Sequence, residues 1–210
     1  MPCTIRPRLR KTATGALAVA AAFAATAPEA HPYRIDPTHT GVHWEVLHMG
    51  TSTSRGRFDS LTGQAAFEPG RLLTVDITVQ TASVSTGIPV FDRVLRGSSL
   101  LAVESHPQAR FVSGEVRWAA DGVSPQALDG QLTLRGRTQP LVLHAQRWRC
   151  GNNPIFGREV CGGDFRASLS RSAFGLGFAG AMADDTVQLL IQVEAVRSEA
   201  GDEPPPGAPR

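Results

Sequence analysis

The chain lacks most of the features that mark common enzymes and nucleic-acid-binding proteins. Its formal net charge is only +2 over 210 residues and its basic residues are scattered, which excludes a concentrated nucleic-acid-binding surface. It contains no G-x-S-x-G elbow, no H-E-x-x-H and no glycine-rich phosphate loop, so esterases, zinc proteases and P-loop enzymes are not indicated. The one long apolar run, residues 16–25, is too short to cross a bilayer, which needs about 20 residues.

What the sequence does have is a strict alternation of apolar and polar residues. Val42, Trp44, Val46 and His48 fall on one face of an extended segment, and the same period of two returns downstream between Gly, Pro and Asp-Gly turn signals. Strands are expected near 33–36 with 40–48, 54–59, 63–68, 72–80, 108–118, 127–135, 138–149, 161–172 and 186–196. This pattern predicts an all-β barrel or sandwich of about eight strands in a single domain over 33–197.

The stretch between Ser85 and Pro107 departs from the strand pattern. Its apolar residues are spaced nearer 3.6 than 2, which predicts a short helical insertion near 89–104. Pro89 suits a first helical turn, and Gly97 is expected to separate two short helices. Such a pair could close one mouth of a barrel or gate a ligand, and the sequence leaves both roles open.

The two ends of the chain are expected to lie outside the fold. Basic residues followed by the apolar run 16–25 predict a signal peptide over 1–27 and hence a periplasmic protein. An uncleaved anchor and an Ala-rich disordered tail are the alternatives. At the other end, residues 198–210 are predicted to form a disordered Pro-rich tail.

Export changes the interpretation of the cysteines. Cys150 is expected to end one strand and Cys161 to begin the next, so a disulfide would close the loop 151–160. Free thiols, or half of a metal site, are the alternatives, but no other cysteine survives cleavage to complete a zinc set. The sequence therefore favours the disulfide.

Several blocks of residues follow one another in an order typical of one known family. They are Tyr33-Arg34-Ile35-Asp36 with His39-Thr40 and Val42-His43-Trp44-Glu45-Val46; His48-Met49-Gly50 with Gly56-Arg57-Phe58; Asp92 to Arg96 with His106-Pro107 and Phe111; Asp129 to Gly136; and Ser170 to Gly175. Over about 33–196 the chain thereby resembles the YceI-like family, exported lipocalin-like barrels described as polyisoprenoid- or lipid-binding. Val94 stands where the family often has histidine, and the segment from Cys150 to Cys161 is not a general family feature.

The resemblance implies an eight-stranded antiparallel lipocalin-like barrel whose interior takes a long apolar chain. A barrel of eight strands leaves just enough room for side chains or for one slender ligand. The expected ligand-binding residues are those on the apolar strand faces: Val42, Trp44, Val46, His48, Phe58, Ile77, Phe111, Leu134, Leu143 and Phe165. Ordinary core packing is the alternative role for each of them.

The polar candidates are few. His48 could meet a lipid headgroup at the barrel mouth or be a buried histidine bonded to the backbone. Arg55, Arg57, Arg96 and Arg171 could bring positive charge to a mouth or lie in solvent at strand ends. His39 and His43 would lie about 13 Å apart along a strand, so no metal site is predicted.

These observations predict a periplasmic protein that binds or sequesters a long-chain amphiphile, such as a polyisoprenoid, a quinone-like molecule or a fatty lipid. It is expected to be neither an enzyme nor dependent on a cofactor, metal or nucleic acid, and self-association into a homodimer stays open. One alternative is a barrel hydrolase or isomerase that uses His48 as general base. Another is a structural or redox-partner module of a membrane protein.

Overall fold

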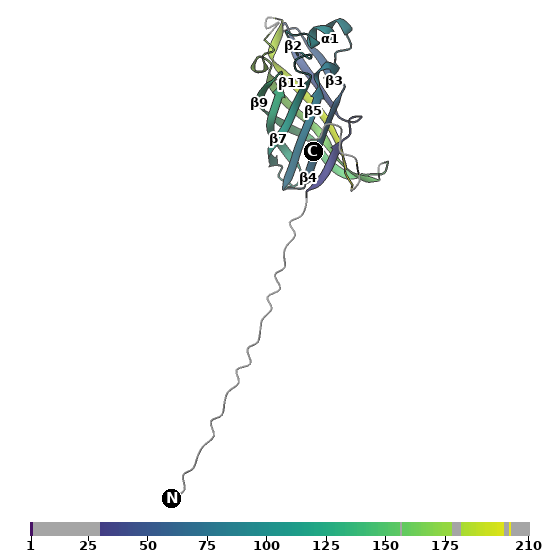
Figure 1. Cartoon of the computed structure of the whole chain (residues 1–210), viewed down its shortest axis with the longest axis vertical. Coiled ribbons are helices and arrows are strands. Elements are labelled where there is room, and N and C mark those ends of the chain that lie inside the picture. The colour runs from purple at the N-terminus through teal and green to yellow at the C-terminus, as the bar shows by residue number, and fades with distance from the viewer. Residues whose placement is uncertain (2–29, 156, 178–181, 200–201, 203–210) are drawn as a thin grey trace.

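The computed structural model of the chain forms one barrel (Figure 1). It describes residues 1, 30–155, 157–177, 182–199 and 202. The predicted signal peptide falls within the residues that are not described, as does most of the predicted tail. At the start of that tail, the Ser198 amide donates to the Pro32 carbonyl at 2.9 Å and Asp202 pairs with Arg158 at 2.7 Å.

The described residues form eleven strands and one α-helix. The main strands lie where apolar and polar side chains alternate in the sequence. The strands are β1 His31–Ile35, β2 Gly41–His48, β3 Ser52–Phe58, β4 Leu61–Glu68, β5 Leu72–Gln80, β6 Val84–Ser85, β7 Gln108–Trp118, β8 Pro125–Leu134, β9 Arg137–Asn153, β10 Arg158–Ser170 and β11 Ala183–Arg197. The helix is α1, Pro89–Arg96, and two 3-10 turns are η1, Thr81–Ser83, and η2, Ser172–Phe174.

Eight of these strands close a ring. Each pairs antiparallel with its neighbour in the order β1-β4-β5-β7-β8-β9-β10-β11, and β11 pairs again with β1. β11 is long enough to pair with β1 through Ala195–Arg197 and with β2 through its earlier residues, so β1 and β2 share one position in the wall. The predicted eight-stranded antiparallel barrel is confirmed.

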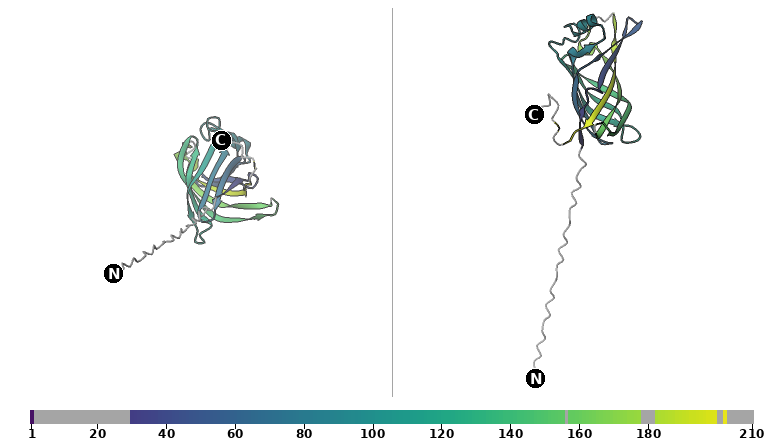
Figure 2. Two further views of the ribbon diagram at one scale, coloured as in Figure 1. Left: turned by 60° about the horizontal axis from the view of Figure 1, so that its bottom comes forward. Right: turned by 90° about the vertical axis from the view of Figure 1, so that its right-hand side faces the viewer.

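At one end of the barrel, every strand of the ring is hydrogen-bonded to both of its neighbours. At the other end, called the upper end because it lies uppermost in Figure 1, β3 pairs with β6 over two residues and β6 pairs with no further described strand. Residues 98–107 fill this seam: Arg135 donates to the Ser98 carbonyl at 2.7 Å, and Thr81 donates to the carbonyls of His106 and Pro107 at 2.7 and 2.9 Å. Figure 2 shows α1 lying at the same end.

The predicted helical insertion is present, but it contains one helix rather than two. α1 ends at Arg96, and Gly97 is extended with φ −63° and ψ 163°. Residues 98–105 then run through turns, with Ala102 at φ 51°, while Leu100, Leu101 and Val103 pack into the upper part of the core. The helix-like spacing of these residues therefore reflects their contacts and not a second helix.

The predicted disulfide joins Cys150 and Cys161, but the segment that it encloses is a paired β-hairpin and not an irregular loop. β9 continues to Asn153 and β10 begins at Arg158, so the two cysteines face each other as a cross-strand pair inside a hairpin. That hairpin projects from the lower end of the barrel (Figure 2). Within the described residues, no helix is long and apolar enough to cross a membrane.

Two apolar clusters fill the barrel from opposite ends. The lower cluster is built on Tyr33, Ile35, Leu61, Phe67, Leu73, Phe111, Leu128, Leu141, Leu143, Cys161, Phe165, Ala167 and Ala195. The upper cluster is built on Trp44, Val84, Leu101, Leu134, Phe174 and Leu176. Leu132, Leu169 and Leu189 pack against both clusters, so they mark the middle of the barrel.

Candidate functional site

Nine of the ten predicted ligand-binding residues lie in the barrel interior. Phe111, Leu143 and Phe165 are buried in the lower cluster, with Val42 and Ile77 packed against it. Trp44 and Leu134 are buried in the upper cluster, with Val46 and Phe58 packed against it. The alternation of side chains therefore identified the inward face correctly, and ligand contact at these positions stays a prediction.

The interior is not filled evenly along the barrel. On β11 the inward-facing side chains Val187, Leu189, Ile191 and Val193 are only half-buried, and the row ends at the buried Ala195. All five pack against the apolar clusters, so they face the inside of the barrel. Apolar side chains in a close-packed core leave almost no accessible surface. The row along β11 is therefore apolar surface that faces the inside of the barrel and is not fully covered by neighbouring side chains.

Two aromatic rings lie directly against glycines of the inner wall. A Cβ added to Gly56 would come within 2.3 Å of the Trp44 ring, and one added to Gly130 within 2.4 Å of the Phe111 ring. Gly56 is the direct cross-strand partner of Trp44. Because glycine lets each ring lie against the backbone, the rings take up less of the barrel's cross-section.

Aromatic rings close the lower end of the interior. Phe67 lies with its ring centroid 5.4 Å from that of Trp148, 6.4 Å from that of Trp118 and 6.5 Å from that of Tyr33. Trp148 also contacts Phe165 at 6.2 Å. All of these contacts except the tilted pair of Phe67 and Trp118 are edge-to-face. Such packing stabilises by about 0.5–1.5 kcal/mol per pair beyond area burial. The aromatic layer therefore packs the lower end of the barrel, where the row along β11 ends at Ala195.

His48 is the predicted site residue that the structure places elsewhere. It is exposed at the end of β2 and belongs to neither cluster, so a buried histidine bonded to the backbone is wrong. Within the described part of the chain its imidazole has no hydrogen-bond partner. Its place at the upper end is compatible with the headgroup role, which stays a prediction.

The four candidate arginines are all engaged by the protein. Arg55 pairs with Glu45 at 2.6 Å, and Arg57 pairs with Asp59 at 2.6 Å, both on the outer surface. Each pair includes well-exposed atoms, so its contribution to stability is about 0–1 kcal/mol. Neither arginine points a free charge at the interior.

The other two arginines hold the upper end together. Arg96 donates to the carbonyls of Ala82 and Val84, both at 2.7 Å. Arg171 is buried and donates to the carbonyls of Leu176, Ala183 and Asp184 at 2.6, 2.9 and 2.8 Å. A solvated strand end is therefore the wrong role for Arg171. Such a clamp on backbone carbonyls leaves no local signal in sequence beyond the Ser-Arg-Ser block.

Sequence reasoning also missed a buried carboxylate at this end. Asp92 of α1 is buried and accepts hydrogen bonds from the Thr86 amide at 2.7 Å and the Thr86 hydroxyl at 2.6 Å. These bonds hold the pKa of Asp92 below its usual range. The pair fixes the entry into α1, and its signal in sequence was a threonine preceding a first-turn aspartate.

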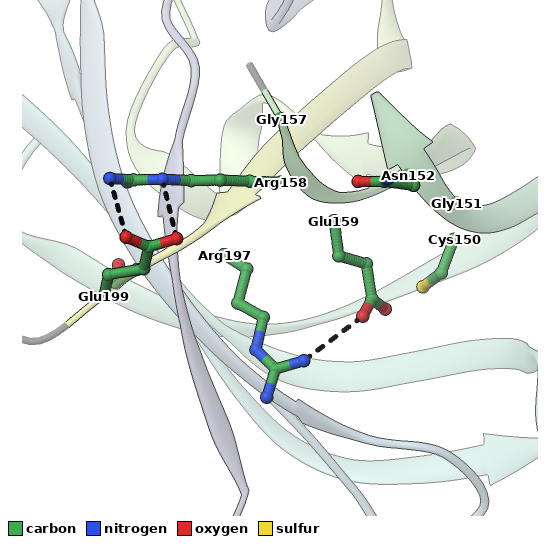
Figure 3. A pocket seen from close by; sticks show the side chains of 9 residues that line it. Cys150, Gly151, Asn152, Gly157, Arg158, Glu159, Arg197 and Glu199 are labelled. Atoms are coloured by element: carbon green, nitrogen blue, oxygen red, sulfur yellow. Dashed lines mark hydrogen bonds and ion pairs between the residues drawn. The ribbon is translucent and has the colours of Figure 1, made fainter. Parts of the chain in front are cut away.

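A polar groove on the outer surface lies beside the disulfide. It measures about 710 Å³, and Figure 3 shows its ion pairs, Arg158 with Glu199 and Arg197 with Glu159. The Tyr33 hydroxyl donates to Glu159 at 3.2 Å; burial, and then the nearby carboxylate, raise the pKa of Tyr33 to about 12. Its charges satisfy one another, so the groove does not suit a long apolar chain.

One histidine and two carboxylates lie close together on the outer surface. The group does not contain the pair of histidines that the sequence analysis considered. His39 bonds Asp36 at 2.7 Å, and this carboxylate raises the pKa of the imidazole. Glu194 completes the group, whereas His43 is not part of it. The pair is explained by its own hydrogen bond, and the absence of a metal site stays a prediction.

Known proteins resemble this chain over nearly all of the described barrel. The family model described as "YceI-like domain" matches residues 33–195. A UPF0312 protein from Serratia proteamaculans (strain 568) is 33% identical over 196 residues, which covers 91% of this chain and all of that protein. The two chains therefore match over nearly their whole lengths.

Solved structures agree in fold. A YCEI protein from Campylobacter jejuni superposes with a TM-score of 0.64 at 23% identity, covering 73% of this chain and 90% of that one. A polyisoprenoid binding domain from Saccharophagus degradans superposes with a TM-score of 0.58 at 15% identity, covering 79% and 98%. Because the family model matches nearly all of the barrel, this chain belongs to the YceI-like domain family.

Proposed function

We propose that the protein binds a long-chain amphiphile, such as a polyisoprenoid, a quinone-like molecule or a fatty lipid, inside its barrel. The observation that carries the proposal is the half-buried row Val187, Leu189, Ile191 and Val193, whose apolar surface faces inward and remains accessible. The relationship to a polyisoprenoid binding domain supports the same ligand class. The protein would sequester this ligand without converting it.

Apolar burial is the main favourable contribution to binding, and it exceeds the cost of association only when a long stretch of chain is buried. Burial of apolar surface contributes about 25 cal/mol per Å², so hiding on the order of 400 Å² of a hydrocarbon chain contributes about 10 kcal/mol. Association itself costs roughly 4–15 kcal/mol. With no free arginine among the four candidates, recognition of the headgroup adds little, and selectivity among chains of similar length should be modest.

A binding role also accounts for His48 better than catalysis does. A general base needs a partner that orients its imidazole, and His48 has none among the described residues. Turnover of a hydrophobic ester or isoprenoid by the purified protein, lost in His48→Gln, would contradict a pure binding function.

The proposal includes a periplasmic location, supported by the leader-like composition of residues 1–27. N-terminal sequencing of protein from the periplasmic fraction should give a new terminus between Ala25 and Pro28. Recovery of the intact chain from the cytosol or inner membrane would contradict the location and leave the ligand proposal standing.

The ligand proposal is tested by enlarging one inward-facing side chain of β11 and, as a control, its outward-facing neighbour. Leu189 faces inward in the middle of the barrel, whereas its neighbour Leu190 faces the outer surface beside His43 and Glu45, and both leucines are half-buried. We expect Leu189→Trp to abolish co-purified lipid in native mass spectrometry and Leu190→Trp to retain it. Lipid extraction of the same samples identifies the chain.

Stability separates cavity from core in this experiment. In a packed core the larger ring of Leu189→Trp would cost about 1–3 kcal/mol in strain, whereas in a ligand cavity it is accommodated. If delipidated Leu189→Trp melts far below the wild type while lipid stays bound, the middle of the barrel is ordinary core and the proposal is wrong.

A further inference from the structure

Exposed apolar side chains gather at the upper end of the barrel. Of the ten exposed large apolar residues in the described part of the chain, six lie there: Leu47, Met49, Ile88, Val90, Val94 and Met182. They are called the rim below. Figures 1 and 2 place the elements that carry them, the end of β2 and α1, at the same end of the molecule.

The rim has two sides. On one side, the Met49 amide donates to the Met182 carbonyl at 3.1 Å, which joins the turn after β2 to the start of β11. On the other side, Val90 and Val94 stand four residues apart on the same face of α1, 58% and 49% exposed. Apolar surface thus borders the upper end from separate elements.

α1 carries apolar side chains on its outer face as well as on its inner face. Its carboxylate Asp92 is buried, while Val90 and Val94 face outward and Phe91 and Leu95 pack against the upper cluster. A surface helix normally turns its charged residues outward. Apolar residues on both faces indicate that the outer face has a partner of its own.

The rim is held in place from within. Asp92 accepts two bonds from Thr86, Arg96 donates to the carbonyls of Ala82 and Val84, and Arg135 donates to the carbonyls of Ser98 and Gly175. These bonds fix the backbone that carries α1 and its neighbours, so the exposure of the rim side chains is a property of the folded protein.

We propose that the rim docks the barrel onto the surface of a lipid bilayer. The rim side chains project from separate elements: Met49 and Met182 from turns, Leu47 from the end of β2, and the others from α1 and the residue before it. Gly50 and Gly87, at φ 65° and 78°, have open space around them. Separate projecting chains suit fluid lipid better than a flat protein face. The rim also surrounds the end toward which the inward row of β11 runs, from Ala195 up to Val187.

The charges beside the rim fit the same partner. Arg93 lies exposed between Val90 and Val94 and forms no ion pair with a described residue, so its guanidinium can reach lipid phosphates while its stem stays in the interface. On the opposite side of the rim, Asp184 is exposed two residues after Met182. Because its negative charge opposes the positive charge of Arg93, the electrostatic attraction to an anionic surface is weak. Apolar insertion is thus the main source of binding.

The inference rests on the proposed function in one respect: docking places the barrel interior against the membrane that holds the protein's ligand. It is tested separately, by flotation of protein recovered from cells expressing the full-length chain. The probes are vesicles of phosphatidylcholine alone, and of phosphatidylcholine and phosphatidylglycerol in equal parts. The test variant is Val90→Ser with Val94→Ser, and the control is Val123→Ser.

The control is matched in exposure. Val123 is 48% exposed, against 49% for Val94, but lies in the turn after β7 at the lower end, where Gly122 adjoins Gly70. We expect the wild type and Val123→Ser to float with both kinds of vesicle, and the rim double variant to bind on the order of tenfold more weakly. Melting temperatures of all three should agree, since every substituted side chain is exposed.

Equal flotation of the rim variant and the wild type would overturn the inference, as would a wild type that floats with neither vesicle. If the wild type is a dimer that the rim variant converts to a monomer, and it does not float, the rim binds a second copy and not lipid. Leu189→Trp separates the two proposals: flotation without bound lipid supports docking alone, whereas lipid in a protein that never floats leaves only the ligand proposal.

Discussion

Replacing Gly56 with alanine is expected to destabilise the barrel, because the Trp44 ring occupies the space that the new methyl group needs. The added Cβ would lie 2.3 Å from Cζ2 and 2.6 Å from Cε2 of Trp44, and 3.0 Å from the Ser85 carbonyl oxygen. The indole is 8% exposed and packed in the upper cluster, so it cannot move aside freely. Overpacking of this kind costs about 1–3 kcal/mol.

Thermal unfolding followed by circular dichroism measures the effect. For a domain of this size each kcal/mol lowers the melting temperature by about 2–4 °C. Gly114→Ala is the matched control: it also lies in a strand, and its nearest outside atom, the Asp129 carbonyl oxygen, is 3.6 Å from the added Cβ. That control should be neutral or stabilising by up to about 1 kcal/mol, since alanine restricts the unfolded chain.

A double-mutant cycle then assigns the cost to the ring. In a Trp44→Leu background the smaller side chain leaves room for the methyl group, so Gly56→Ala should lose much less stability there. If Gly56→Ala melts at or above the wild-type temperature in the native background, the indole does not lie across Gly56. The description of the inner wall would then be wrong.

Three further changes probe the ends of the barrel. Tyr33 is the only tyrosine, so absorbance at alkaline pH should show one phenol titrating near pH 12, lowered in Glu159→Gln. Because the folded pKa lies above the unfolded value of about 10, this group's stabilisation is complete below pH 10 and is lost toward pH 12; a titration near 10 would refute its burial. Reducing the bond between Cys150 and Cys161, 11 residues apart, should lower stability by about 3 kcal/mol, and alkylation without reductant should label neither cysteine. Arg171→Met should cost about 1–3 kcal/mol in urea unfolding by stranding its carbonyl partners, and an unchanged midpoint would contradict the clamp.

The regular part of the barrel could be read from the sequence because one physical rule governs it. Residues 72–80 and 108–118 were predicted as strands and are β5 and β7. A wall that is apolar inside and polar outside must alternate at every second residue, and short local windows of sequence record that alternation. The inward face of Trp44 and Phe111 followed from the same rule.

The errors occur where tertiary contacts override the local pattern. Residues 98–105 have helical spacing, but after the extended Gly97 they fill a seam in the wall and bond to Arg135 and Thr81. The hairpin around Cys150 extends to Asn153 through glycine and polar residues that lack strand character. No local window contains the partner that decides either outcome.

Within the candidate site, the interior could be predicted but its boundaries could not. Alternation identifies which side chains face inward, yet whether they fill the space depends on all the strands at once. The exposed His48 and the buried Arg171 show the same limit for polar residues. Arg171 is stabilised by carbonyls up to 13 residues away, in a segment whose path the sequence does not reveal.

Because the wall has a seam beside β6, the barrel can open locally without unfolding. The segment 98–107 fills it with side-chain packing and a few bonds to carbonyls, not with a strand ladder, while the eight-stranded ring below remains paired. Detaching this segment therefore breaks no strand pairing and costs far less than global unfolding. Its amides should exchange with solvent sooner than those of β8 to β11. A guest could enter or leave through local opening while the cross-linked frame stays folded.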